Sequence, residues 1–111
     1  MKVERRTVGT IDVCTPTDAI ADEAIDDFGR AMRQCLDGAH ARVVVCMNEV
    51  GYMNSRALEL LLDAADELAE RGAQLKLASV TPTCREIFEL TGMSNRFQFF
   101  EDVDAAVRSF L

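Results

Sequence analysis

The clearest indication of the fold comes from residues 43–62, VVVCMNEVGYMNSRALELLL. Its first five residues are all apolar, which is typical of a strand covered on both faces of a sheet. After a short loop, Leu58, Leu61 and Leu62 recur at the spacing of one helical face. The stretch therefore predicts a buried strand, a loop, and a helix that begins near Ser55.

Ser55 lies at this predicted helix start, where a hydroxyl has two roles open to it. The first N–H groups of a helix lack intrahelical partners and its dipole is positive there, so the hydroxyl can be exposed or modified at little structural cost. It can also cap the helix through its side-chain oxygen, a role worth ~1 kcal/mol. Asn54 can cap equally well, so the sequence leaves both roles open for Ser55.

The composition argues against nucleic-acid-binding and membrane-associated functions. The chain has 111 residues, 49% of them hydrophobic, and a formal charge of -7, which predicts one acidic globular domain over residues 1–111. The charge argues against nucleic acid and anionic membranes as partners, because both require clustered Lys and Arg. No apolar segment approaches the roughly 20 residues that span a bilayer, and the N-terminus lacks the apolar core of a signal peptide. We therefore expect no membrane insertion and a cytoplasmic location.

The sequence offers no catalytic or metal-binding cluster. The four cysteines are widely spaced and fall on apolar or helix-facing positions, so we expect them to be buried and free. His40 is the only histidine and lies in a predicted loop, which leaves no Ser–His or Cys–His pair and no multi-histidine metal site. We predict no metal, no cofactor and no enzymatic activity.

The remaining elements alternate between strand and helix. The expected strands are an edge strand at residues 2–6 and further strands at 8–15, 42–47, 74–78 and 97–100. The expected helices cover residues 22–36, 55–71, 81–90, with Thr81 as a hydroxyl cap, and 102–110. Such alternation with short connections predicts an α/β fold with a mostly parallel sheet of four to five strands and about four helices.

Three segments carry a family resemblance. The string Val50 to Leu61 resembles the phosphorylation loop of STAS domains, the sulfate-transporter and anti-sigma-factor-antagonist family, in which Asp-Ser-Ser/Thr-Gly-Leu follows an apolar strand. Residues 78–93 are similar to the family's second loop and its helix, and residues 99–106 to its last strand and helix. Ser55 and Leu58 match the motif, whereas Asn54, Arg56 and Ala57 replace its acidic, second hydroxyl and glycine positions.

The resemblance implies a STAS fold and a bacterial protein that takes part in partner switching. It implies binding to an anti-sigma factor or serine kinase of the ATPase type, gated by phosphorylation of Ser55, with a serine phosphatase as a further partner. The binding surface that we expect surrounds Ser55 and consists of outward-facing residues: Tyr52, Met53, Asn54, Ser55, Arg56 and Glu59.

Several alternatives stay open. Met53 can instead pack on the first helical turn as a hydrophobic staple. Ser79 and Thr81 form either a second hydroxyl site beside the first or a plain capped turn, since both loops follow the carboxyl ends of neighbouring parallel strands. Two other functions are open for the protein. One is a constitutive STAS interaction subunit of a stressosome-like or transporter-regulating assembly, and the other is a sensor of a small ligand such as a nucleotide or lipid. The sequence does not define the oligomeric state.

Overall fold

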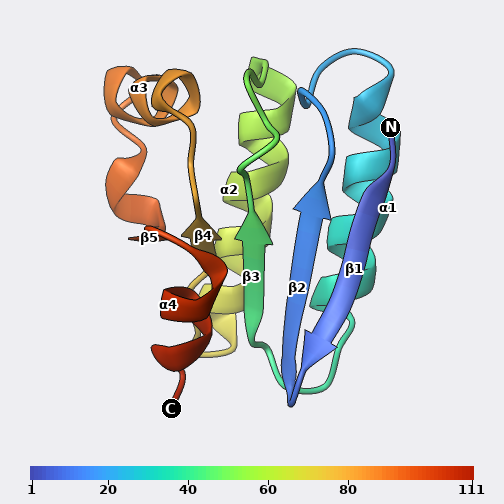
Figure 1. The fold of residues 1–111 in the computed structure, drawn as a ribbon, viewed down its shortest axis with the longest axis vertical. Coiled ribbons are helices and arrows are strands. Elements are labelled where there is room, and N and C mark those ends of the chain that lie inside the picture. The colour runs from blue at the N-terminus through green and yellow to red at the C-terminus, as the bar shows by residue number, and fades with distance from the viewer.

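A computed structural model describes residues 1–111 and contains one five-stranded sheet with strand order β1-β2-β3-β4-β5. The strands are β1 (Val3–Val8), β2 (Ile11–Pro16), β3 (Val43–Cys46), β4 (Lys76–Ala78) and β5 (Gln98–Phe100). The first two strands form an antiparallel hairpin, and the others pair in parallel (Figure 1). The predicted mostly parallel sheet is therefore confirmed.

Four helices cover this sheet: α1 (Ala24–Leu36), α2 (Ser55–Glu70), α3 (Pro82–Leu90) and α4 (Val103–Arg108). A core cluster of 23 buried residues joins the sheet to α1, α2 and α3, and every residue of β3 is buried. Alternation along the strands sends Val43 and Val45 into this cluster and Val44 to the opposite face. The uninterrupted apolar run of β3 is thus explained by burial on both faces.

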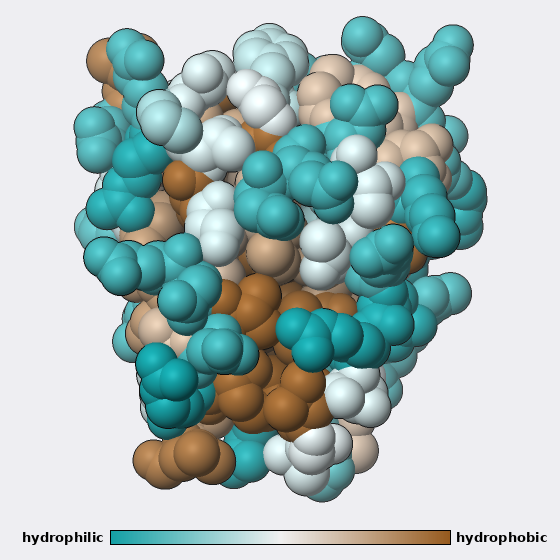
Figure 2. Space-filling view, in the orientation of Figure 1, coloured by the Kyte–Doolittle hydropathy of each residue, from teal (hydrophilic) through white to brown (hydrophobic).

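The opposite face carries a smaller cluster, in which Ala106 of α4 packs with Ile11, Val13, Val44 and Ala78. In Figure 1, α4 lies in front of the sheet, whereas α1 and α2 lie behind it. Partly buried apolar residues of α4 and the neighbouring strands extend this cluster, and Figure 2 shows apolar surface in the lower half of this face. No helix has both the length and the apolar character needed to cross a membrane.

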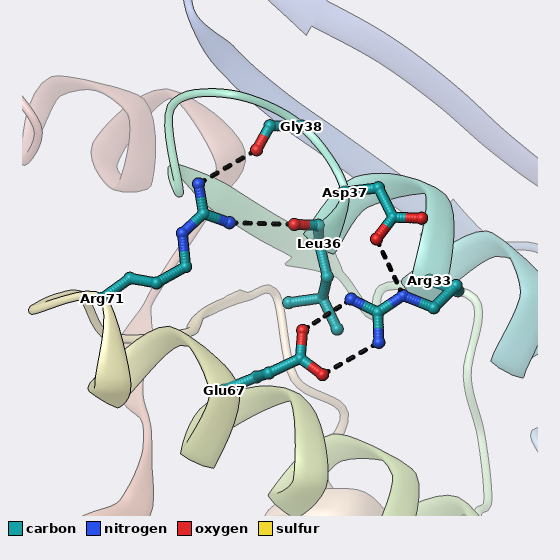
Figure 3. A network of polar contacts seen from close by, with 6 residues as sticks. All are labelled: Arg33, Leu36, Asp37, Gly38, Glu67 and Arg71. Carbon is teal, nitrogen blue, oxygen red and sulfur yellow. Dashed lines mark hydrogen bonds and ion pairs between the residues drawn. The ribbon is translucent and has the colours of Figure 1, made fainter.

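A polar network ties α1 to α2 on the outer side of the core (Figure 3). The guanidinium of Arg33 donates to both carboxylate oxygens of Glu67, at 2.8 and 2.6 Å, and to Asp37 at 3.0 Å. These contacts lower the pKa of Glu67, chiefly through the hydrogen bond from Arg33. Arg71, one residue beyond α2, donates to the backbone carbonyl oxygens of Leu36 and Gly38 at the end of α1.

The structure corrects one helix start and one helix cap. The first helix begins at Ala24 rather than at Asp22, because Asp22 adopts a positive φ of 50° that interrupts helical geometry. Thr81 precedes α3 as expected, and Pro82 occupies its first turn, but the Thr81 side chain makes no capping hydrogen bond. The four cysteines are all free and buried, as predicted.

Candidate functional site

The candidate site is formed by two loops that leave the carboxyl ends of β3 and β4. The first loop, residues 47–54, leads to Ser55, and the second, residues 79–81, leads to α3. The carbonyl oxygen of Val50 joins them, because it accepts hydrogen bonds from Thr81 Oγ1 at 2.7 Å and from Cys84 Sγ at 3.3 Å. Burial raises the pKa of the Cys84 thiol, which favours this donor form. The two loops are therefore held together.

A third segment fixes the first loop from its other side. The N–H of Ile20 donates to the Tyr52 carbonyl at 3.0 Å, and the N–H of Asn54 donates back to the Ile20 carbonyl at 3.2 Å. Ile20 is fully buried and forms an isolated parallel bridge with Met53. The backbone on either side of Met53 is thus anchored in the core before the helix begins.

Asn54, and not Ser55, caps α2. Asn54 has extended backbone angles, and its Oδ1 accepts the N–H of Ala57 at 3.0 Å. Ser55 is the first helical residue; its side chain is exposed and its hydroxyl makes no hydrogen bond with the protein. The N–H groups of Ser55 and Arg56 also donate to no protein atom, as expected for the first turn of a helix. An unengaged hydroxyl therefore lies next to two free backbone donors.

The side chains around Ser55 divide into exposed and buried ones. Tyr52 is 50% exposed, and Arg56 donates to Glu59 at 2.9 Å in an exposed ion pair along α2. Met53 is only 1% exposed, so the expectation that it faces outward is wrong. The physical reason is its pairing with Ile20, which turns Met53 into the same core cluster as Leu58 and agrees with the staple alternative.

The hydroxyls of the second loop are both engaged. Ser79 has a positive φ of 56°, and its Oγ donates to the carbonyl of Glu101 at 3.0 Å. Thr81 uses its hydroxyl to bind Val50 rather than to cap α3, which corrects the expected capped turn. Among the three hydroxyl residues singled out from the sequence, Ser55 alone has an unengaged side-chain oxygen.

Two residues outside the first loop hold it in place and were not predicted from the sequence: Ile20 and Cys84. Ile20 stands in a segment without a helix or strand pattern, and its role depends on a pairing with Met53 that is 33 positions away in the chain. Cys84 was expected only as a small buried residue, and no local signal marks its bond to Val50. The structure also contains no group of three His, Cys, Asp or Glu side chains arranged to hold a metal ion.

A protein-family model and a curated relative match this chain. The STAS domain family model matches residues 2–106. A candidate anti-sigma factor antagonist of Bordetella bronchiseptica, BtrV, is 29% identical over 75 residues, and the match covers 68% of this chain and 65% of BtrV. The chain therefore matches just under two thirds of the length of this curated relative.

Solved structures show the same fold. An anti-sigma-factor antagonist (STAS) domain protein from Planctomyces limnophilus superposes with a TM-score of 0.88 at 18% identity, covering 96% of each chain. The Bacillus cell fate determinant SpoIIAA in its phosphorylated form gives a TM-score of 0.77 at 16% identity, covering 99% of this chain and 100% of SpoIIAA. These two likenesses are evidence for the fold.

The chain belongs to the STAS domain family. It has the α/β fold of the solved STAS structures, a five-stranded, mostly parallel sheet with four helices, and its sequence is similar to that of a candidate anti-sigma factor antagonist.

Proposed function

We propose that this protein is a phosphorylation-gated partner switch. In its unphosphorylated form it binds an anti-sigma factor that is also a serine kinase of the ATPase type, and phosphorylation of Ser55 releases that partner. A serine phosphatase would restore the binding form. The proposal places the protein in the bacterial cytoplasm and treats residues 1–111 as one STAS domain.

The single observation that carries the proposal is the free hydroxyl of Ser55. Asn54 performs the capping role, so Ser55 can react without loss of a structural hydrogen bond. A phosphate on Ser55 would stand at the positive end of α2, close to the unengaged N–H groups of Ser55 and Arg56. The fold can therefore tolerate both forms of the residue, as a reversible switch requires.

The same phosphate would change the surface presented to a partner. Tyr52, Arg56 and Glu59 form the exposed surroundings of Ser55. Arg56 is paired with Glu59, which lies one helical turn from Ser55 and would repel a phosphate there. A partner fitted to the neutral hydroxyl would meet added negative charge that this ion pair does not fully neutralise, so its binding should weaken.

The test begins with recovery of the partner from native lysate, using the wild-type protein as bait and mass spectrometry for identification. Incubation with the recovered kinase and ATP should add one phosphate, which phosphopeptide mapping assigns to Ser55. Ser55→Ala should abolish labelling, whereas Ser79→Ala, the matched control in the second loop, should leave it intact.

Other outcomes of this test distinguish the remaining functions. Label at Ser79 or Thr81 would show that the site assignment is wrong. If the recovered complex contains no kinase and still forms after Ser55 is replaced, the protein is a constitutive STAS interaction subunit and not a switch. A nucleotide or lipid that copurifies with the protein, in place of a protein partner, would favour a ligand sensor.

A further inference from the structure

Lys76 is a buried cation without a carboxylate partner. It opens β4 on the face covered by α4 and is only 8% exposed. Its Nζ donates to Ser109 Oγ at 2.5 Å and lies 3.9 Å from the ring centroid of Phe110. Neither neighbour carries a negative charge, and burial lowers the pKa of Lys76. Burying a cation without a counter-ion costs free energy, which an anion bound nearby would offset.

Lys76 lines an open cavity of about 410 Å³ whose walls contain further cations and no acidic residue. Arg42 and Arg71 line the same cavity, as does His40. None of the three Lys and Arg side chains takes part in an ion pair. In a chain with 19 acidic residues and a net charge of -7, this local excess of unpaired positive charge is opposite to the overall charge.

The two arginines are held in place by neutral groups. Arg71 donates to the carbonyl oxygens of Leu36 at 2.9 Å and Gly38 at 3.0 Å, as Figure 3 shows. Arg42 donates to Thr10 Oγ1 at 2.9 Å. These contacts orient the guanidinium groups without neutralising them, so little side-chain entropy remains to be lost when an anion binds.

The position of the cavity separates it from the partner-switch loop. Arg42 and Lys76 stand at the amino ends of β3 and β4, whereas Ser55 follows the carboxyl end of β3. In a parallel pair of strands these ends lie on opposite edges of the sheet. A ligand here would leave the surface around Ser55 open, so the site does not depend on the proposed switch.

We propose that this cavity binds a phosphate group, either free or carried by a small organic molecule. Arg and Lys are the side chains that recognise phosphate through charge-assisted hydrogen bonds. The volume falls in the lower part of the range of small-molecule sites, roughly 300 to 1,000 Å³, and leaves room for more than the phosphate itself. Lys76 would then gain the counter-charge that the protein does not supply.

The experiment is an NMR titration that follows the chemical shifts of the backbone amides. The protein is titrated with inorganic phosphate and, separately, with ribose 5-phosphate, and chloride keeps the ionic strength constant. The expected result is saturable shifts confined to the residues around Arg42, Arg71 and Lys76. Tighter binding of ribose 5-phosphate would identify an organic phosphate as the ligand, and equal binding would identify free phosphate.

Variants distinguish a specific phosphate site from nonspecific attraction of anions to positive charge. Arg42→Gln and Lys76→Met should each weaken binding roughly tenfold or more, because each removes a charged hydrogen-bond donor. Lys2→Gln, which removes one charge at an exposed and distant position, should leave the affinity unchanged. Arg42 is exposed, so its variant stays informative even if Lys76→Met perturbs the fold. Three results would overturn the proposal: binding that does not saturate, equal phosphate affinity in all three variants, or chemical-shift changes spread over all basic residues.

Discussion

The division of roles between Asn54 and Ser55 makes a sharp prediction for a pair of alanine variants. Asn54→Ala removes the oxygen that accepts the Ala57 N–H at 3.0 Å, so the first turn of α2 loses its cap. Losses of this kind cost ~1 kcal/mol, within a range of about 0.5 to 2. Ser55→Ala removes a hydroxyl without a hydrogen bond from an exposed helical position, and its cost should stay below about 0.5 kcal/mol.

Thermal and urea unfolding of the two variants and the wild type measure this difference. For a domain of about 100 residues, ~1 kcal/mol corresponds to a shift of roughly 4 °C in melting temperature. We expect Asn54→Ala to melt about 4 °C below the wild type and Ser55→Ala to melt within roughly 2 °C of it. The reverse order would mean that Ser55 is the structural cap, and the reasoning that leaves its hydroxyl free for phosphorylation would then be refuted.

Three further predictions concern the loop and the α1–α2 contact. Asn54→Asp keeps a capping oxygen and restores the family's acidic residue before the serine, so phosphorylation of Ser55 should become faster; an unchanged rate in a kinase assay would remove Asn54 from the mechanism. Thr81→Val deletes one of the two hydrogen bonds to the Val50 carbonyl and should lower the free energy of unfolding by about 1 kcal/mol, with faster amide exchange in the first loop as its signature; unaltered exchange would show that the hydroxyl does not hold the loop. Arg33 lowers the pKa of Glu67 below its ordinary value of 4.5, so this contribution to stability is present above that pH and is lost as the pH falls through the lowered pKa. Glu67→Gln should therefore melt below the wild type at pH 7, and the gap should close in acid; a gap that does not shrink at any pH below 4.5 would contradict the ion pair.

The sequence predicts the architecture well, because the fold depends on patterns that are local in the chain. The apolar run at residues 43–47 requires burial on both faces, and β3 is indeed covered by α2 on one side and by α4 on the other. Gly72 ends α2 in the left-handed conformation, with φ of 75°, as its position after the helical pattern indicates. Apolar spacing and helix-ending glycines can be recognised in the sequence without knowledge of tertiary contacts.

The site was less predictable, because its details depend on contacts between distant segments. Met53 follows an exposed-looking loop, and only its pairing with Ile20 explains why it turns inward. Thr81 has the sequence context of a helix cap, but the nearby Val50 carbonyl takes its hydroxyl instead. Lys76 alternates with apolar residues as an outward-facing strand residue would, yet Phe110, 34 positions later, covers it. In each case a tertiary partner overrides the local preference.

The most direct test of the partner switch is a paired measurement on the wild type and Ser55→Glu: melting temperature and affinity for the kinase recovered from lysate. A negative charge at the amino end of α2 should leave the fold intact or stabilise it by ~0.3 to 1 kcal/mol. At a partner surface fitted to a hydroxyl, an unpaired charge costs about 2 to 5 kcal/mol, or roughly 30-fold or more in affinity. We expect Ser55→Glu to melt at the same or a higher temperature and to bind the kinase more weakly by at least that factor. Unchanged binding would contradict the partner switch.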